Sequence, residues 1–274
     1  MRVFMAAVLC TRFLLVAPYP LTAKLRILIA MVRVAARVVT GTNPLEQLAI
    51  ASAILGLKSP GVVVECGTYQ GACAIIMSLA CSMTGRILYI FDSFEGLPEP
   101  TSGDQSHAII RDLQIATYEK GAWLGPLETV KANLKKYGDI SVCRFVPGYF
   151  DQTLPDFKEP VAVAFCDVDL VHSLETCLRH LWPLMSGGGI FFCHEAHHHE
   201  IASLFYDRSW WSQLGFNAPG LVGAGSGIGL MPQPDGSLGS SLGYTLKNPQ
   251  AKKQSLEMGA GNIVYKDTKR ALID

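Results

Sequence analysis

The sequence predicts one α/β domain built on a mostly parallel sheet with helices on both faces, and three observations carry this prediction. After residue 43, short apolar runs rich in β-branched residues alternate with longer runs of helical periodicity, a pattern typical of β-α-β crossovers and a sheet buried on both faces. Polar residues follow four of the apolar runs at the point where each ends. The 274 residues are 49% hydrophobic and 17% charged, which excludes a disordered chain and allows a large core.

The predicted elements follow one another in a regular order. The first is a helix at residues 43–57, in which apolar side chains such as Leu45, Leu48 and Ile54 recur. A loop rich in glycine, proline and acidic residues at 93–107 interrupts the alternation, and the glycines at 187–189 are expected to end the last helix. The remaining elements are predicted strands at 61–66, 87–91, 140–146, 161–166 and 190–193, and predicted helices at 72–83, 126–136 and 171–185.

The first 42 residues are predicted to form a basic helical extension, and residues 43–274 to form the domain itself. Residues 1–45 hold no acid and six bases, which are Arg2, Arg12, Lys24, Arg26, Arg33 and Arg37. No stretch reaches the roughly 18 uncharged apolar residues that a membrane span needs. Three interpretations stay open: an arm that packs on the domain or on a second subunit of a homo-oligomer, an amphipathic helix on an anionic membrane surface, and a processed targeting segment.

Charge and cysteine usage narrow the class of protein further. The 23 Lys and Arg residues balance the 23 Asp and Glu residues, so there is no basic surplus and no nucleic-acid partner is expected. The eight cysteines form no CxxC pair, and five lie in or beside apolar runs, as reduced and buried thiols do: Cys66, Cys73, Cys143, Cys166 and Cys193. We therefore expect a cytoplasmic protein, with peripheral attachment to a membrane through residues 1–42 as the alternative.

Polar residues end four of the predicted strands. In an open parallel sheet the carboxyl ends of the strands share one edge, and ligands bind in the crevice there. Helix capping would explain any one of these residues, but it is a poor explanation for polar residues at the ends of four strands at once. The residues expected to meet at this edge are Glu65, Asp92, Asp167, Asp169, His194 and Glu195.

A glycine turn follows the first predicted strand. Gly67 permits a sharp turn and Gly71 lets the next helix pack near the sheet. Tyr69 and Gln70 stand between them, so the middle glycine of a dinucleotide fingerprint, which lets a pyrophosphate approach the backbone, is absent. This pattern favours a ligand with a ribose but no phosphate, such as S-adenosylmethionine, whose ribose hydroxyls Asp92 would bind.

Four short runs resemble the macrocin O-methyltransferase (TylF/MycF) family over roughly residues 43–200. The most distinctive is Phe-Asp-Ser-Phe-Glu-Gly-Leu-Pro-Glu-Pro at 91–100, and the others lie at 64–67, 146–155 and 167–170. The resemblance implies a class I, Rossmann-like methyltransferase fold, transfer of methyl groups to sugar hydroxyls of natural products, and a divalent metal, usually Mg²⁺. With the glycine turn, it gives a predicted cofactor-binding set of Glu65, Gly67, Tyr69, Gly71, Asp92, Ser93, Gly148, Tyr149 and Phe150.

The predicted metal site consists of Asp167, Asp169, His194 and Glu195, with Asp167 and Asp169 also proposed as catalytic. Hard cations take carboxylate ligands, and a cation can activate and position an acceptor hydroxyl. The chain departs from the family at two places: Val171 stands where a tyrosine is usual, although Ser173 is kept, and His194-Glu195 replaces a pair of aspartates. Because imidazole is a softer ligand, Mn²⁺, Fe²⁺ and Zn²⁺ become alternatives to Mg²⁺, as does loss of metal dependence.

Three other features have simpler interpretations. The order His-Glu-x-x-His at 194–198 matches a zinc-protease signature, but that motif needs a helix, and here it directly follows a strand. The histidines at 197–199 form either a solvated turn or contribute one base or ligand. The glycine-rich run at 223–229 is interpreted as a flexible loop, with a lid over the acceptor as the alternative.

The sequence therefore predicts an S-adenosylmethionine-dependent, divalent-metal-assisted O-methyltransferase. Its acceptor is expected to be a hydroxyl of a small molecule such as a sugar or a natural-product glycoside. Two alternatives remain: an NAD(P)-dependent oxidoreductase, which shares the strand, the glycine turn and the acid at the next strand end, and a non-catalytic cofactor-binding module.

Overall fold

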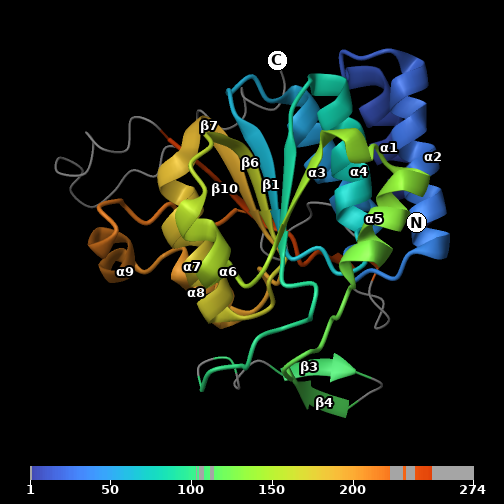
Figure 1. Cartoon of the computed structure of the whole chain (residues 1–274). Coiled ribbons are helices and arrows are strands. Elements are labelled where there is room, and N and C mark those ends of the chain that lie inside the picture. The colour runs from blue at the N-terminus through green and yellow to red at the C-terminus, as the bar shows by residue number, and fades with distance from the viewer. Residues whose placement is uncertain are drawn as a thin grey trace.

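A computed structural model of the chain shows a twisted sheet with helices packed on both faces (Figure 1). The structure describes residues 2–102, 104, 108–111, 114–222, 231–232 and 238–248. The six-stranded sheet runs in the order β10-β7-β6-β1-β2-β5, and only β10 is antiparallel to its neighbour. Its strands are β5 (Cys143–Pro147), β2 (Leu88–Asp92), β1 (Val62–Cys66), β6 (Val161–Cys166), β7 (Met185–Cys193) and β10 (Gly243–Leu246). The prediction of a mostly parallel sheet is confirmed.

The two faces of the sheet carry two groups of helices and two separate hydrophobic cores. Side chains alternate along each strand, so Val63 of β1 packs in one core and Val64 in the other. The first group of helices is α1 (Arg2–Val16), α2 (Leu21–Arg37), α3 (Pro44–Gly56), α4 (Ala72–Thr84) and α5 (Leu127–Tyr137). The second group, on the other face in Figure 1, is α6 (Phe150–Thr153), α7 (Val171–Leu181), α8 (His199–Leu204) and α9 (Arg208–Gln213).

Short elements complete the described fold. A hairpin of β3 (Ala108–Arg111) and β4 (Gln114–Thr117) projects beyond one end of the sheet (Figure 1). A second pair is β8 (Met231–Pro232) with β9 (Leu238–Gly239). Three 3₁₀ turns lie at Ile140–Val142, Leu154–Asp156 and Trp182–Leu184. The glycine-rich run at 223–229 lies outside the described residues.

Three predicted boundaries are wrong, for identifiable reasons. The strand predicted from residue 140 begins at Cys143, because residues 140–142 form a 3₁₀ turn whose start is capped by Asp139. The last helix ends at Leu181 rather than at the glycines, because Pro183 has no amide hydrogen to continue the helical ladder. The glycines at 187–189 lie inside β7, where Met185 pairs with Val161 but Ile190 pairs with Val163, so the intervening residues bulge out of register.

The first two helices pack on the domain through one face of α2. Ile27 and Val34 are fully buried there, and α2 contacts α4. A helical extension is therefore present, although its separation from the domain at residue 42 stays a prediction. No helix in the described part of the chain has both the length and the apolar content to cross a membrane. All eight cysteines are free thiols, and seven of them are buried.

Candidate functional site

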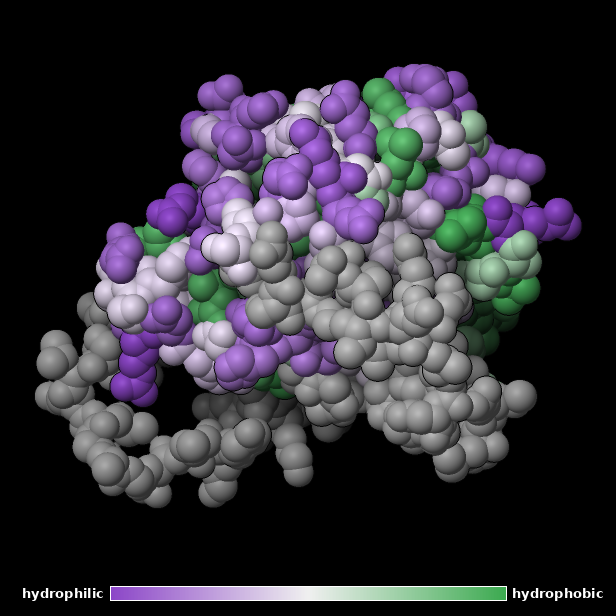
Figure 2. Space-filling view, turned by 90° about the horizontal axis from the view of Figure 1, so that it is seen from below, coloured by the Kyte–Doolittle hydropathy of each residue, from purple (hydrophilic) through white to green (hydrophobic). Residues whose placement is uncertain are grey.

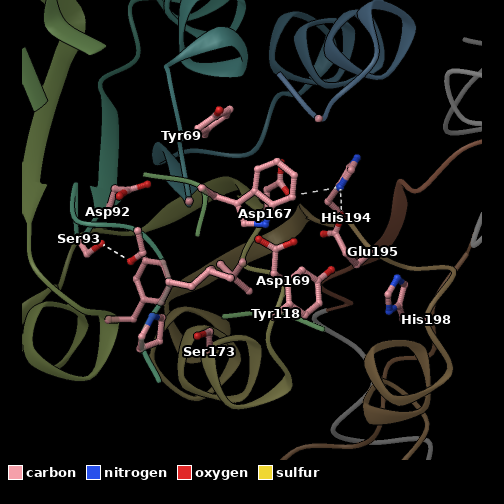
Figure 3. Close-up of a pocket in the computed structure, with 18 of the residues that line it drawn as sticks. Tyr69, Asp92, Ser93, Tyr118, Asp167, Asp169, Ser173, His194, Glu195 and His198 are labelled. Carbon is pink, nitrogen blue, oxygen red and sulfur yellow. Dashed lines mark hydrogen bonds and ion pairs between the residues drawn. The ribbon is translucent and has the colours of Figure 1, made fainter. Parts of the chain in front are cut away.

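A cavity of about 900 Å³ opens along the carboxyl ends of the parallel strands. Its lining includes Gly67 after β1, Asp92 at the end of β2, Asp167 after β6 and His194 after β7. Figure 3 shows Asp92 and Ser93 at one end of this space and His194 and Glu195 at the other. The polar residues predicted to meet at the carboxyl ends of the strands, Glu65 excepted, therefore do line one cavity. A cavity of this volume can hold a nucleoside together with a second small molecule.

The glycine turn brings two strand ends into close contact. Gly67 has a φ of +82°, and a Cβ atom there would lie 1.9 Å from the carbonyl oxygen of Asp167. No other residue permits this approach. Gly71 is the N-cap of α4 with a φ of +85°, and Tyr69, with a φ of +48°, packs its ring edge-on against Trp123.

The side chain of Asp92 is held by the backbone around it. The Thr68 amide donates to Oδ2 at 2.7 Å and the Phe94 amide donates to Oδ1 at 2.6 Å. Burial raises the pKa of Asp92, and the backbone amides of Thr68, Phe94 and Tyr69 oppose the rise. A carboxylate offers about four lone-pair positions, so the group can still accept a hydrogen bond from a ligand in the cavity.

The structure places six of the nine predicted cofactor-binding residues on the cavity lining and three behind it. Those on the lining are Gly67, Tyr69, Asp92, Ser93, Tyr149 and Phe150. Glu65 is fully buried, Gly71 caps α4 against Val130, and Gly148 turns the chain into α6 while its amide donates to the Asp92 carbonyl. These three support the lining rather than form it.

Glu65 is an unusual buried acid. Neither carboxyl oxygen has a hydrogen-bond partner. Burial raises the pKa of Glu65 well above its ordinary value, and the nearby negative charges of Asp167 and Asp92 raise it further. The surroundings of Glu65 therefore favour its protonated form.

Three of the four predicted metal ligands form a compact group. One potential ligand atom from each of Asp167, His194 and Glu195 lies within 4.8 Å of the others. The His194 Nδ1 atom faces Asp167 Oδ1 at 3.2 Å and contacts Glu195 Oε1 more closely (Figure 3). We call this group the triad.

Asp169 lines the same cavity but stands outside the triad. Its backbone is left-handed, with a φ of +58°, as is that of Glu195, with a φ of +49°. Such conformations cost free energy in non-glycine residues and cluster at functional sites. Burial raises the pKa of Asp169 well above its ordinary value, and the charges of Glu195 and Asp167 add to the rise.

The triad is dominated by negative charge. Burial alone would lower the pKa of His194, but the carboxylates of Asp167 and Glu195 raise it well above its ordinary value. Burial raises the pKa of Glu195 to about 7 against the opposing charge of His194. Burial would also raise the pKa of Asp167, yet His194 holds it below its ordinary value.

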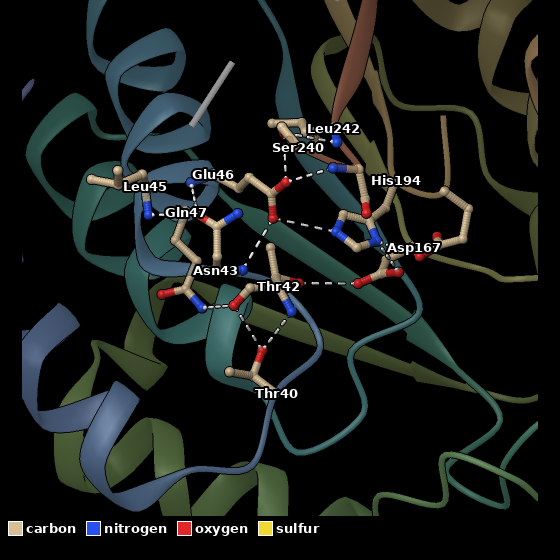
Figure 4. A network of polar contacts seen from close by, with 12 residues as sticks. Thr40, Thr42, Asn43, Leu45, Glu46, Gln47, Asp167, His194, Ser240 and Leu242 are labelled. Carbon is tan, nitrogen blue, oxygen red and sulfur yellow. Dashed lines mark hydrogen bonds and ion pairs between the residues drawn. The ribbon is translucent and has the colours of Figure 1, made fainter. Parts of the chain in front are cut away.

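Glu46 of α3 contacts the other side of the histidine ring, a residue that no sequence pattern singled out. Its Oε2 atom lies 3.4 Å from His194 Nε2. Three donors hold this carboxylate: Ser240 Oγ at 2.6 Å, the Ser241 amide at 2.9 Å and the Asn43 amide at 3.0 Å (Figure 4). Asn43 and Glu46 also form a capping box at the start of α3.

A divalent cation fits this donor set. The triad offers two carboxylates and one imidazole nitrogen, and Glu195 Oε2 is buried without a hydrogen-bond partner. Three carboxyl groups, those of Glu46, Asp167 and Glu195, contact one imidazole, so a cation would neutralise surplus negative charge. Such a mixed set suits Mn²⁺ and Fe²⁺ as well as Mg²⁺.

The loop after β2 forms part of the cavity lining. Leu97, Tyr118 and Leu170 form a small apolar cluster with Trp123, and three of these four side chains, Leu97, Tyr118 and Trp123, line the cavity. Asp104 of the same loop is buried and accepts a hydrogen bond from the Val171 amide at 2.7 Å, which caps α7. Leu97 belongs to the run at 91–100, but no local sequence pattern points to Asp104, Tyr118 or Trp123, because their partners lie in distant segments.

The three consecutive histidines separate in the structure. His197 and His198 line the cavity, and His199 begins α8. Among the described residues, no group of candidate metal ligands includes His198, so the pair of histidines that a zinc-protease site needs does not converge. Burial and the nearby His198 lower the pKa of His197 to about 4.

A family model of macrocin O-methyltransferase (TylF) matches residues 6–207 of the chain. The chain is similar to a tetracenomycin-C rhamnosyl 4'-O-methyltransferase from Streptomyces olivaceus, with 36% identity over 160 residues, which cover 56% of this chain and 60% of the relative. It is also similar to mycinamicin III 3''-O-methyltransferase from Micromonospora griseorubida, with 32% identity over 136 residues, or 47% of this chain and 53% of the relative. The matched region thus spans between half and three-fifths of these relatives.

Solved structures share the fold. The O-methyltransferase NovP has a TM-score of 0.64 at 20% identity and covers 83% of this chain and 98% of its own. The O-methyltransferase TomG from Streptomyces achromogenes, solved with S-adenosylmethionine, has a TM-score of 0.50 at 12% identity, covering 90% of this chain and 95% of its own. The class I, Rossmann-like fold predicted from the sequence is confirmed.

Proposed function

The chain belongs to the macrocin O-methyltransferase (TylF) family, and from this premise we propose that it transfers a methyl group from S-adenosylmethionine to a hydroxyl of a small glycoside, with help from a divalent cation. The observation that carries the proposal is one cavity with two different ends. Asp92 lies at one end, and the triad of Asp167, His194 and Glu195 lies at the other. One relative is named for methylation of a rhamnosyl tetracenomycin and another for methylation of mycinamicin III, which supports this class of acceptor.

We assign the nucleoside to the end of the cavity formed by Asp92 and the glycine turn. The backbone amides that hold the Asp92 carboxylate orient it and leave it able to accept a hydrogen bond from a ribose hydroxyl. Tyr149 and Phe150 line the same end and offer ring surface to an adenine. Gly67 lets this turn pack directly against the backbone of Asp167, where a side chain would collide with the carbonyl oxygen.

We assign a divalent cation to the triad. When bound, the cation lowers the pKa of the acceptor hydroxyl and fixes its position. Asp167 and Glu195 would bind it through carboxylate oxygens and His194 through Nδ1. Glu46 would accept a hydrogen bond from His194 Nε2, which fixes the tautomer that leaves Nδ1 free to bind.

In the transfer itself, the acceptor oxygen forms a bond to the methyl carbon as the carbon–sulfur bond breaks, and S-adenosylhomocysteine leaves as a neutral thioether. The hydroxyl proton needs an acceptor. We assign this role to Asp169, because it lines the cavity close enough to Asp167 and Glu195 for their charges to raise its pKa, yet it stands outside the triad. Leu97, Tyr118 and Trp123 add apolar surface to the cavity lining, which reduces the water that can compete with the acceptor hydroxyl.

Calorimetry with S-adenosylhomocysteine and NAD⁺ tests the cofactor assignment. We expect micromolar binding of S-adenosylhomocysteine and no binding of NAD⁺, whereas binding of NAD⁺ alone would contradict the proposal and favour an oxidoreductase. Asp169→Asn separates the roles at the other end: it should slow methyl transfer by at least about tenfold while leaving cation affinity unchanged. If Asp169→Asn lowers cation affinity as much as it lowers the rate of methyl transfer, Asp169 is a cation ligand instead.

A further inference from the structure

The outward face of α2 carries an exposed apolar stripe. Leu21, Leu25, Ile29 and Val32 are 58%, 39%, 50% and 72% exposed. Their spacing of four, four and three residues places them on one side of the helix. Ile27 and Val34, which are fully buried, lie on the opposite side and pack on the domain. The stripe is therefore not needed to hold α2 in place.

The stripe belongs to a larger apolar surface at the N-terminal helices. Of the eleven exposed large hydrophobic side chains among the described residues, seven lie between positions 8 and 39. Figure 2 shows apolar residues gathered with strongly polar ones at the edge of the molecule where Figure 1 places α1 and α2. Monomeric proteins scatter such residues singly, so a concentration of them indicates an interaction surface.

Arginines line one flank of the stripe. Arg26, Arg33 and Arg37 are exposed and fall about a quarter-turn from the apolar side chains on the helix surface. Arg26 Nη2 donates to the carbonyl of Gly138 at 3.5 Å, whereas no ion pair of Arg33 or Arg37 is found among the described residues. The first 45 residues hold no acid at all, and although the charge of Arg26 acts on Asp139, Arg33 and Arg37 leave the flank with surplus positive charge.

We propose that this face of α2 lies on an anionic lipid surface and attaches the protein peripherally to a membrane. An amphipathic helix in this position buries its apolar stripe among the lipid chains while its basic flank contacts the phosphates of the headgroups. Arginine suits this role because its guanidinium binds phosphate oxygens in pairs.

Charge argues against a second copy of the chain as the occupant. In a two-fold symmetric dimer the same patch faces itself, so Arg33 and Arg37 of one copy would face those of the other with no carboxylate from residues 1–45 between them. An anionic membrane relieves this repulsion, and it also accommodates the apolar stripe.

Co-sedimentation of the full chain with lipid vesicles tests the proposal. We expect binding to phosphatidylcholine vesicles that contain about a third phosphatidylglycerol, and at least about tenfold weaker binding to pure phosphatidylcholine or at high salt. The double variants Ile29→Ser with Val32→Ser and Arg33→Gln with Arg37→Gln should each weaken binding by at least about tenfold. Leu124→Ser, which removes a side chain that is 49% exposed elsewhere, is the matched control and should bind like the unaltered chain.

Two results would overturn the proposal. One is equal binding to neutral and anionic vesicles, or none to either. The other is a concentration-dependent dimer, seen by light scattering, that dissociates in the variant with Ile29→Ser and Val32→Ser, since this would make a second copy the occupant. Unchanged affinity for S-adenosylhomocysteine in every variant shows that the fold is intact, so a failure of the membrane proposal stays separate from that of the proposed activity.

Discussion

Replacing Glu46 by Gln tests the arrangement of the cation site through a residue that we do not assign as a ligand. In the unaltered chain the Glu46 carboxylate accepts hydrogen bonds from Ser240, Ser241 and Asn43, and its Oε2 atom faces His194 Nε2. A glutamine has the same shape but only one accepting oxygen. If that oxygen faces Ser240 and Ser241, the amide hydrogens face His194 Nε2 and favour the tautomer with the proton on Nδ1. This tautomer cannot bind a cation through Nδ1.

The size of the effect follows from the hydrogen bonds that the glutamine cannot make. Partners that orient a metal-binding histidine typically contribute 10- to 100-fold in metal affinity, which corresponds to about 1.4–2.7 kcal/mol. The reverse orientation of the glutamine avoids the tautomer change, but it leaves the buried Ser240 hydroxyl and the Ser241 amide facing amide hydrogens, at a cost of about 1–3 kcal/mol for each unpaired group. Both orientations therefore weaken the site.

The assay is titration with Mn²⁺ followed by calorimetry and by electron paramagnetic resonance. We expect Glu46→Gln to bind Mn²⁺ at least about tenfold more weakly than the unaltered chain, with S-adenosylhomocysteine affinity preserved. Asn43→Ala is the matched control, because it removes the side-chain cap of α3 and costs about 1 kcal/mol of stability while its backbone amide still supports Glu46. Its Mn²⁺ affinity should not change.

Two outcomes would refute this reasoning. If Glu46→Gln binds Mn²⁺ within about twofold of the unaltered chain while Asp167→Asn abolishes binding, Glu46 serves only to cap its helix. If Asn43→Ala weakens Mn²⁺ binding as much as Glu46→Gln does, the effect comes from the stability of α3 and not from the orientation of His194.

Three further predictions concern the other end of the cavity. Gly67→Ala should lower the free energy of unfolding, measured with urea, by more than about 3 kcal/mol. The new Cβ would meet the Asp167 carbonyl oxygen at 1.9 Å, and the residue has a φ of +82°. A loss below about 1 kcal/mol would contradict this prediction. Glu65→Gln should remove a pH dependence of the free energy of unfolding. Because the folded pKa of Glu65 is raised, the stability of the unaltered cofactor-free chain falls as pH rises above the unfolded pKa near 4.3. The fall is up to about 1.4 kcal/mol per pH unit. Urea unfolding of both forms at pH 5 and pH 8 checks this, and parallel profiles would be the contrary result. Asp92→Asn should weaken binding of S-adenosylhomocysteine by about tenfold or more in calorimetry without changing Mn²⁺ affinity; normal binding would show that the ribose lies elsewhere.

The edge of the sheet could be predicted from the sequence because its signals are local. Each short β-branched run ends in a polar residue, and parallel strands bring such ends together whatever lies between them. The positions of Asp92, Asp167 and His194 on the cavity follow from this rule alone.

The pairing of Glu46 with His194 could not be predicted in the same way. The two residues are 148 positions apart, and the spacing of Asn43 and Glu46 is fully explained by a capping box. The same holds for Asp169, which stands two residues from Asp167 in the sequence but outside the triad, where its backbone is left-handed. The bulge at 187–189 likewise depends on how β7 pairs with β6, and not on its own residues.

The most direct test of the account is a crystal structure of the chain with S-adenosylhomocysteine and Mn²⁺, using the anomalous signal of manganese. The account predicts one anomalous peak among Asp167, His194 and Glu195, with the ribose hydroxyls of the ligand on the Asp92 carboxylate in the same cavity. A peak remote from the triad, or a nucleoside bound away from Asp92, would contradict it.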